Sequence, residues 1–248
     1  MICVLAATLK ELDFFLSKLG PLWQFTLRER RVWQGRWQSF EIIVAETGVG
    51  PVNAAHMTTV LLERYPLKLI LLVGCAGAFP DIYLKKGDVV LATGEIWAEA
   101  GAYTEKGWQS LAEIGLPYWE KGKTQQYNCF WVDRLMIKTL IKIIPEVLPP
   151  KVGFKSGLFL TVSATTGNKE RLRLMKRRFP EAICENMEGA AIAQVAQIYK
   201  VPWVEMRGIS NFVGEYDKTK WDIDWAVQNC QRCLINLLAR GQEWIPSN

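Results

Sequence analysis

The sequence predicts an α/β domain with a mixed, largely parallel central sheet. Short apolar runs rich in β-branched residues alternate with segments of helical periodicity, which is typical of strand-helix-strand units. The 248 residues contain no internal repeat and no low-complexity tract, and 50% are hydrophobic while 22% are charged. Because this is the composition of a globular protein, we expect a single domain over residues 1–248.

The expected strands are apolar, β-rich runs that end at glycine, proline or polar residues. Residues 2–7 form the first, and residues 31–37 and 41–46 follow it. Residues 69–74 lead into a series of small residues, and residues 88–97 and 155–162 continue the pattern. Polar residues cluster at the ends of the last two strands, residues 182–185 and 203–209.

Helices are expected to begin near Thr8, Pro51, Asp133, Asn168, Met187 and Trp221. Proline suits the first turn of the second helix, where a missing N–H costs nothing. Residues 169–178 are basic, but their apolar members recur on one face, which favours a solvated helix surface over a phosphate or nucleic-acid site. Residues 101–130 are irregular, and we expect a long loop with local structure there.

Composition argues against several classes of partner. The net charge of +5 comes from 30 basic and 25 acidic residues spread along the chain, which is too mild an excess to imply nucleic acid. The longest apolar stretch, residues 69–79, falls short of the roughly 20 residues that a membrane-spanning helix needs. The first residues lack a basic leader, so we expect a cytoplasmic protein without a membrane partner.

The six cysteines and the single histidine do not indicate a metal or redox site. Several cysteines lie in apolar runs, where a thiol behaves as a small hydrophobic group. Cys230 and Cys233 have CxxC spacing but fall in a helical pattern with no second pair to complete a zinc site. No catalytic triad can be assembled around His56. We therefore expect no metal and no organic cofactor.

Two segments place polar residues at the ends of apolar runs, residues 185–191 (ENMEGAA) and 207–211 (RGISN). In an open α/β sheet, ligands bind outside the carboxyl ends of the strands, so both segments should face one crevice. The crevice would then contain the carboxylate of Glu188 and the amide of Asn211. This combination predicts a site for a polar small molecule.

Three further features lie at the same predicted edge. Glu11 falls in the first turn after the first strand, where position alone favours a helix-dipole partner over a catalytic group. The turn at Gly48 and Gly50 leaves helix N–H groups free for an anion or a hydroxyl, although it is not a GxGxxG dinucleotide motif. The small residues Cys75 to Gly77 either allow close packing or leave room for a flat ligand ring.

Taken together, these motifs resemble the nucleosidase branch of the nucleoside phosphorylase superfamily, which includes methylthioadenosine/adenosylhomocysteine nucleosidases and futalosine hydrolases. Six motifs occur in the family's order over most of the chain, and GPVNAA (50–55), TVS (161–163), RGISN (207–211) and WD (221–222) most resemble futalosine hydrolases. The resemblance implies a single-domain, three-layer α/β sandwich and a homo-oligomer. The six motifs are Glu11, residues 48–50, residues 74–77, residues 87–90, residues 186–191 and residues 207–211.

The resemblance also implies roles for particular residues. Glu188 would bind the ribose hydroxyls, Met187 would pack against the ribose, and Glu11 would act as general base toward water. Arg207 and Ser210 would hold Asn211, with an ion-pair role equally open for Arg207. The other residues expected to bind substrate are Gly48, Cys75, Ala76, Gly77, Thr165, Thr166, Asn186 and Trp221. Residues 163–166 lack the aromatic residue of the family, and Trp221 is open to a flap or a core role.

Asn211 departs from the adenine-specific members of the family, which carry an aspartate here. An amide can donate N–H to a 6-oxo group while its carbonyl accepts from a protonated N7, which suits hypoxanthine. The implied reaction is therefore hydrolysis of futalosine to hypoxanthine and dehypoxanthine futalosine, in the futalosine route to menaquinone. The alternatives are an adenosine-type nucleosidase, a 6-oxopurine phosphorylase, or a nucleoside binder without activity.

Overall fold

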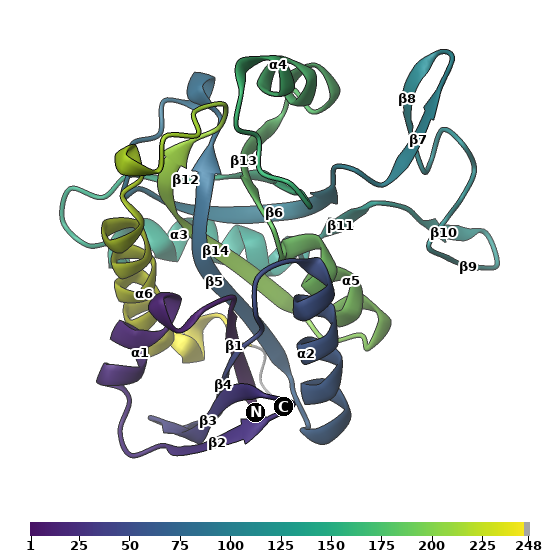
Figure 1. The fold of residues 1–248 in the computed structure, drawn as a ribbon. Coiled ribbons are helices and arrows are strands. Elements are labelled where there is room, and N and C mark those ends of the chain that lie inside the picture. The colour runs from purple at the N-terminus through teal and green to yellow at the C-terminus, as the bar shows by residue number, and fades with distance from the viewer. Residues whose placement is uncertain (246–248) are drawn as a thin grey trace.

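A single ten-stranded mixed sheet organises the chain. The computed structural model describes residues 1–245, and Figure 1 shows their arrangement. The strands are β1 (Ile2–Ala6), β2 (Trp23–Leu27), β3 (Arg30–Trp37), β4 (Phe40–Glu46), β5 (Leu69–Ala78), β6 (Val89–Trp97), β11 (Cys129–Trp131), β12 (Phe154–Thr161), β13 (Ala182–Asn186) and β14 (Trp203–Phe212). The helices are α1 (Asp13–Lys18), α2 (Pro51–Arg64), α3 (Arg134–Val147), α4 (Lys169–Arg178), α5 (Gly189–Ile198) and α6 (Ile223–Ala239).

Part of the sheet closes on itself. The strand order is β11-β6-β12-β13-β5-β1-β4-β3-β2, and β14 pairs with both β5 and β6. Strands β5, β13, β12, β6 and β14 therefore form a ring, in which β5 runs parallel to β14 and antiparallel to β13. Parallel pairs also join β1 to β4 and β5, and β12 to β6 and β13. The predicted mixed, largely parallel sheet is confirmed.

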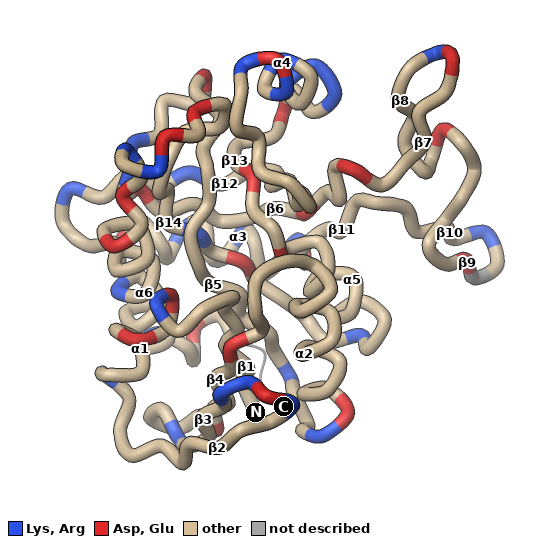
Figure 2. Tube along the Cα trace, viewed as in Figure 1, with Lys and Arg blue, Asp and Glu red and all other residues tan. Residues whose placement is uncertain are grey.

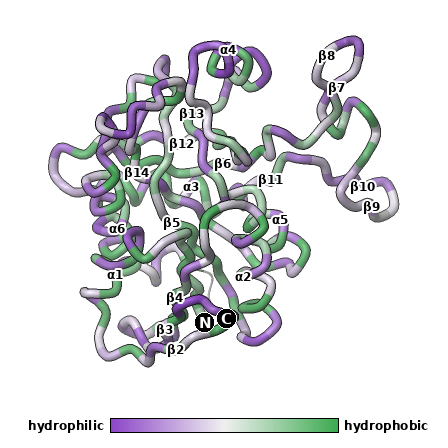
Figure 3. The backbone as a smooth tube through the Cα atoms, viewed as in Figure 1, coloured by the Kyte–Doolittle hydropathy of each residue, from purple (hydrophilic) through white to green (hydrophobic). Residues whose placement is uncertain are grey.

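Helices cover both faces of the sheet and give it two apolar cores. Helices α2 and α5 cover one face, where Met57, Leu61 and Ile192 are fully buried. Helices α1, α3 and α6 cover the other, where Phe15 and Leu234 are fully buried. Figure 3 shows hydrophobic and hydrophilic residues alternating along these helices. The alternation of strands and helices in the sequence therefore produces the predicted three layers.

Several predicted boundaries were wrong because local patterns do not reveal where pairing ends. Strands β5 and β14 both continue past their predicted ends to Ala78 and Phe212, since these last residues still pair with each other. Strand β2 was missed; it forms an edge hairpin with β3 and is largely exposed. No α-helix begins at Thr8, which instead precedes a 3-10 turn over Leu9–Glu11.

The expected loop over residues 101–130 contains regular structure instead. Hairpins β7 (Gly101–Thr104) with β8 (Gly107–Ser110) and β9 (Trp119–Lys121) with β10 (Thr124–Gln126) project from the body as an arm (Figure 1). Strand β11 then returns to the main sheet, antiparallel to β6. The predicted local structure is thus confirmed, and the irregular stretch consists of short exposed hairpins.

The cysteines are free thiols, and the basic helix α4 lies at the surface. All six cysteines are free, and Cys230 and Cys233 are buried in α6, where burial raises both thiol pKa values. Within residues 1–245 no cluster of three or more potential metal ligands occurs, and none of the helices there could span a membrane. Figure 2 shows the Lys and Arg residues of α4 on the outer surface of the molecule.

Gly208 allows helix α6 to lie directly on strand β14. A Cβ atom at this position would lie 2.0 Å from the Ala226 carbonyl oxygen and 2.5 Å from its carbon, and backbone atoms cannot move aside cheaply. We expect Gly208→Ala to lower the free energy of unfolding by about 1–3 kcal/mol, as overpacked cores do. Denaturant titration measures this change, with Gly20→Ala as the control because Gly20 has no neighbour within 4 Å. Equal stability of the two variants would contradict the close contact.

Candidate active site

A cavity of about 480 Å³ opens at the edge of the sheet where β5, β13 and β14 end. Its volume lies within the range of about 300–1,000 Å³ that small-molecule sites occupy. Glu188 and Asn211, the polar residues from which the sequence predicted a site, line this cavity together with Glu11. The lining comprises Ala7, Thr8, Lys10, Glu11, Val49, Cys75, Ala76, Gly77, Val162, Thr165, Thr166, Glu185, Asn186, Met187, Glu188, Arg207, Ser210, Asn211, Tyr216, Lys218, Trp221 and Ile223.

Of the fourteen residues predicted for the site, only Gly48 lies outside this lining. Gly48 has φ +87°, and the space beside its Cα is filled by the Arg30 guanidinium, 2.7 Å from where a Cβ would lie. Its neighbour Val49 lines the cavity instead. Gly48 therefore shapes the turn, and the turn presents the adjacent side chain to the cavity.

Sequence reasoning missed several lining residues. Glu185 is buried at the end of β13, and its place directly before the NME motif was a signal that could have identified it. Tyr216 and Lys218 come from the segment between β14 and α6, and Ile223 is the first residue of α6; in this region only residues 221–222 gave a motif in the sequence. These residues enter the site only because β14 continues to Phe212 and delivers the segment to the cavity rim.

Glu11 is held at the wall by three donors. The N–H and hydroxyl of Thr8 donate to Glu11 Oε2 at 2.9 and 3.0 Å, and the Cys75 N–H donates to Oε1 at 3.1 Å. Burial raises the pKa of Glu11, and the positive charge of Arg207 opposes that rise. A carboxylate with a raised pKa and a fixed orientation is suited to accept a proton from a water molecule in the cavity.

Glu188 contacts both the glycine turn at residues 48–50 and the guanidinium of Arg207. The Gly50 N–H donates to Glu188 Oε1 at 2.9 Å, and Arg207 Nη2 lies 3.4 Å from Oε2. The expectation that the turn leaves its N–H groups free is therefore wrong for Gly50, which binds a carboxylate of the protein itself. Both oxygens of Glu188 retain lone pairs that can accept hydroxyl groups from a ligand.

Asn186 fixes the orientation of the segment that carries Glu188. Its Oδ1 accepts the N–H groups of Glu188 and Gly189 at 2.9 and 2.7 Å, and so caps the start of α5. Its Nδ2 donates to Glu95 on β6, which also accepts the Thr161 hydroxyl at 2.8 Å. Asn186 therefore supports the ligand-binding carboxylate from behind, besides lining the cavity.

Arg207 is the central cation of this edge of the sheet. It is 1% exposed, and its Nε donates to Glu205 Oε1 at 2.7 Å. Gly74 lies between the guanidinium and Glu11, since a Cβ there would be 2.6 Å from Arg207 Nη1 and 2.5 Å from Glu11 Oε1. One buried guanidinium thus holds three carboxylates, Glu11, Glu188 and Glu205, around the cavity floor.

Behind Arg207, the carboxyl groups of Glu95 and Glu205 meet in the core. Both are fully buried, and Glu95 Oε1 and Glu205 Oε2 converge on Gly189, where a Cβ would lie 2.1 and 2.5 Å from them. Glu205 Oε2 receives no donor from any other described residue. The pair must share a proton, and burial raises the pKa of Glu95, with the charge of Glu205 adding to the rise.

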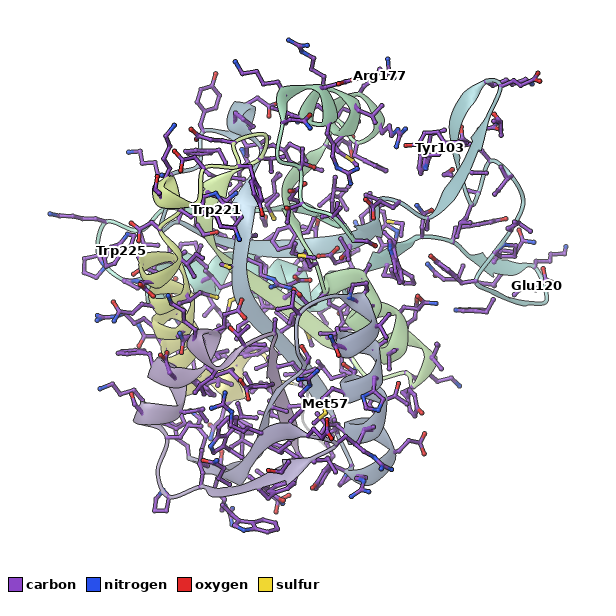
Figure 4. The ribbon with its side chains drawn as sticks, viewed as in Figure 1. Met57, Tyr103, Glu120, Arg177, Trp221 and Trp225 are labelled. Carbon is purple, nitrogen blue, oxygen red and sulfur yellow. The ribbon has the colours of Figure 1, made fainter. Side chains whose placement is uncertain are left out.

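The Glu95 pair should make stability depend on pH. The folded state retains a proton that the unfolded chain loses above the ordinary glutamate pKa of 4.5, so stability falls as pH rises from there toward the raised value. Glu95→Gln removes the titration and still offers an N–H to Glu205, so we expect a shallower decline. Thermal unfolding between about pH 5 and pH 8 measures it. Glu120 is exposed (Figure 4), so Glu120→Gln serves as the control. If the slope of stability against pH were identical in the parent and in Glu95→Gln, the shared proton would be contradicted.

Ser210 and Asn211 lie near the carboxyl end of β14 and line the cavity there. The Ser210 hydroxyl donates to Asn211 Oδ1 at 2.8 Å and also lies 3.3 Å from the Ala76 carbonyl oxygen. Asn211 Nδ2 has only a long contact of 3.4 Å, to the Phe212 carbonyl oxygen. The amide nitrogen lies over Gly77, 3.0 Å from where a Cβ would be. The absence of that Cβ lets the Asn211 amide and the Val213 side chain lie close against β5.

Aromatic side chains reach the cavity from the segment after β14. The rings of Tyr216 and Trp221 meet edge to face with their centroids 6.0 Å apart, and Tyr216 packs on Gly167. Figure 4 shows Trp221 beside the central strands, whereas Trp225 lies at the outer side of the molecule. These rings provide the aromatic surface that residues 163–166 lack.

Comparison with known proteins agrees with this architecture. The sequence profile of the phosphorylase superfamily matches residues 1–240. The chain is 33% identical over 71% of both sequences to a 5′-methylthioadenosine/S-adenosylhomocysteine nucleosidase of Shewanella loihica. It is 31% identical to the futalosine hydrolase of Thermus thermophilus, covering 79% of this chain and 81% of that one.

A solved structure matches the fold over nearly the whole chain. The 5′-methylthioadenosine/S-adenosylhomocysteine nucleosidase of Neisseria meningitidis superposes with a TM-score of 0.83 at 20% identity, covering 96% of this chain and 98% of that one. The chain therefore belongs to the phosphorylase superfamily. Within that superfamily it is an N-glycosyl hydrolase of the nucleosidase branch.

Proposed function

We propose that this chain is a futalosine hydrolase, which cleaves the N-glycosidic bond of futalosine and releases hypoxanthine and dehypoxanthine futalosine. The reaction would belong to the futalosine route to menaquinone. The observation that carries the proposal is Asn211, a cavity-lining residue whose Oδ1 accepts the Ser210 hydroxyl and whose Nδ2 has a long contact of 3.4 Å to the Phe212 carbonyl oxygen. An amide N–H in this place can donate to the O6 or N7 acceptors of hypoxanthine.

The same amide fits adenine less well. Adenine presents an amino donor where hypoxanthine presents its 6-oxo acceptor, so Nδ2 of Asn211 would face another donor. Turning the amide would place Oδ1 toward the amino group, and the Ser210 hydroxyl would then exchange its 2.8 Å bond to Oδ1 for the longer one of 3.3 Å to the Ala76 carbonyl oxygen. Asn211 also cannot deliver a proton to N7 as a carboxylic acid can, and it would instead stabilise the negative charge that develops on the leaving base.

The remaining residues would act on the sugar and the nucleophile. Glu188 accepts the ribose hydroxyls, and Met187, half-buried beside it, packs against the sugar. Glu11 takes a proton from water as the bond to the base breaks and the ribose acquires oxocarbenium character. Burial raises the pKa of the Cys75 thiol to about 12, which disfavours ionisation to a nucleophilic thiolate. A homo-oligomer and a cytoplasmic location form part of the same proposal.

An adenosine-type nucleosidase is the second candidate. The relatives named 5′-methylthioadenosine/S-adenosylhomocysteine nucleosidase outnumber the futalosine hydrolase among the most similar curated proteins. A 6-oxopurine phosphorylase would use the same base contacts but would require phosphate. A nucleoside binder without activity would keep the cavity and lack turnover.

One assay separates these possibilities. Purified protein is incubated with futalosine, inosine and methylthioadenosine, each with and without phosphate, and the released base is quantified. We expect phosphate-independent release of hypoxanthine from futalosine. Adenine release from methylthioadenosine alone would favour the second candidate, a phosphate requirement would favour the phosphorylase, and futalosine binding without any release would indicate a binder.

A further inference from the structure

Glu205 binds Arg207 from outside the cavity. The two residues lie two positions apart on β14, and Glu205 is fully buried and does not line the cavity, whereas Arg207 does. Arg207 Nε donates to Glu205 Oε1 at 2.7 Å. The contacts that Arg207 makes with lining residues are longer, since Nη1 lies 3.4 Å from the Cys75 carbonyl oxygen and Nη2 lies 3.4 Å from Glu188 Oε2. The shortest hydrogen bond of this guanidinium is therefore to a residue behind the site.

Arg207 and Glu11 are neighbours that form no ion pair with each other. Gly74 separates them, because a Cβ there would lie 2.6 Å from Arg207 Nη1 and 2.5 Å from Glu11 Oε1. Within the part of the chain that the structure describes, the ion pairs of Arg207 are with Glu188 and Glu205. An unbalanced guanidinium beside a carboxylate favours the ionised form of that carboxylate and makes it a weaker base. A general base at Glu11 therefore needs the charge of Arg207 to be balanced by another group.

The carboxyl pair behind Arg207 supplies one negative charge. Glu95 and Glu205 share a proton, and the charge stays on Glu205 because its Oε1 accepts from the guanidinium. Replacement of Glu95 by glutamine therefore alters the buried pair but leaves the charge on Glu205. Replacement of both glutamates by glutamine removes the charge and keeps oxygen atoms for the buried donors.

We propose that Glu205 is a positioning residue for the general base: it binds Arg207 Nε and balances the guanidinium charge, so that Glu11 stays free to take a proton from water. Glu205 acts through Arg207 and does not touch the substrate. The inference rests on the proposed role of Glu11 in hydrolysis. Its structural alternative is that the buried pair only stabilises the core beneath α5, a role that would affect stability and leave the titration of Glu11 in place.

The other titratable groups around this cluster are unaffected by substitution at positions 95 and 205. Glu188 stands on the cavity side of Arg207, and Lys10 at the cavity rim pairs with Asp224 on the surface. Burial raises the pKa of the nearby thiols, so they carry no charge near neutral pH. These thiols are Cys75 on β5, Cys184 on β13 and Cys230 on α6.

The test records kcat/KM against pH for the parent, for Glu95→Gln and for the double variant Glu95→Gln/Glu205→Gln, with whichever nucleoside the parent cleaves. We expect the acid limb to move to lower pH by about 1 unit in the double variant, because the guanidinium then acts on Glu11 without a balancing charge. The limb should keep its parental position in Glu95→Gln, the matched control. A limb that stays in place in the double variant, or that moves equally in Glu95→Gln, overturns the role of Glu205.

Carbon-13 NMR of protein labelled at the glutamate carboxyl carbons gives a readout that does not need turnover. The Glu11 resonance is identified by its loss in Glu11→Gln, and its titration midpoint should fall in the double variant but not in Glu95→Gln. A parent that cleaves no nucleoside contradicts only the proposed function, because this midpoint still decides the role of Glu205.

Glu205→Gln alone serves if the double variant does not fold. Its glutamine oxygen still accepts from Arg207 Nε, and Glu95 can carry the negative charge farther from the guanidinium, so the buried cation is not left unbalanced. We expect a smaller fall of the Glu11 midpoint in the same direction. An unchanged midpoint in this variant would count against the proposal.

Discussion

Glu11→Gln is expected to lower kcat for base release by about 10²- to 10⁴-fold, the usual contribution of a general base. Glutamine keeps the size of the side chain and an oxygen for the Cys75 N–H, but it cannot accept a proton from water. KM should change little, because the sugar and base contacts belong to Glu188, Asn211 and their neighbours. Steady-state assays of base release measure both constants.

The pH profile provides a second measure of the same role. Because burial raises the pKa of Glu11, the acid limb of kcat/KM in the parent should lie above pH 4.5, the ordinary glutamate value. That limb should disappear in Glu11→Gln. Glu120→Gln, on the projecting arm (Figure 4), serves as the control. A Glu11→Gln enzyme with parental kcat would rule out Glu11 as the base.

Arg207→Met should be the most destabilising substitution in the site. We expect a loss of about 3–5 kcal/mol in the free energy of unfolding near neutral pH, because removal of one partner leaves buried charges uncompensated. Glu205 Oε1 would lose its donor at 2.7 Å, and Glu11 and Glu188 would lose the buried guanidinium beside them. Urea titration measures this loss.

The loss should shrink as pH falls, since protonation of the carboxylates removes the charge that Arg207 balances. Titrations at about pH 7 and pH 5 test this dependence. Arg240→Met is the control, because Arg240 pairs with Glu146 and Glu243 on the surface, where water screens the charges. Similar losses for both arginine variants would contradict the central role of Arg207.

Local sequence patterns predicted the elements better than their ends. The runs of apolar residues located the strands that carry the site, because a buried strand needs such residues wherever it pairs. They could not show that β5 and β14 stay paired as far as Ala78 and Phe212, since the length of the pairing depends on the partner strand. The exposed strand β2 and the arm hairpins lacked a strong pattern because they bury little surface.

Polar residues at strand ends were the most productive signal for the site. Glu188 and Asn211 stood out because a carboxylate and an amide beside buried strands require partners. Glu185 was visible in the same motif, but its free oxygen was not, because hydrogen bonding depends on Thr166 from another segment. Glu95 and Glu205 are 110 positions apart in the sequence, so the local pattern around neither residue could predict that their carboxyl groups meet.

The sequence by itself determined the α/β layers, the site residues carried by short motifs, and the amide at Asn211 on which the substrate proposal depends. These follow from local chemistry, since burial periodicity and side-chain type act within a few residues. Only the tertiary structure decided that Glu185 and Asn211 both pair with Gly77, from the strands on either side of it, and that one guanidinium lies among three carboxylates. The physical reason is that strand register and ring closure bring distant segments together, and register is set by pairing between strands.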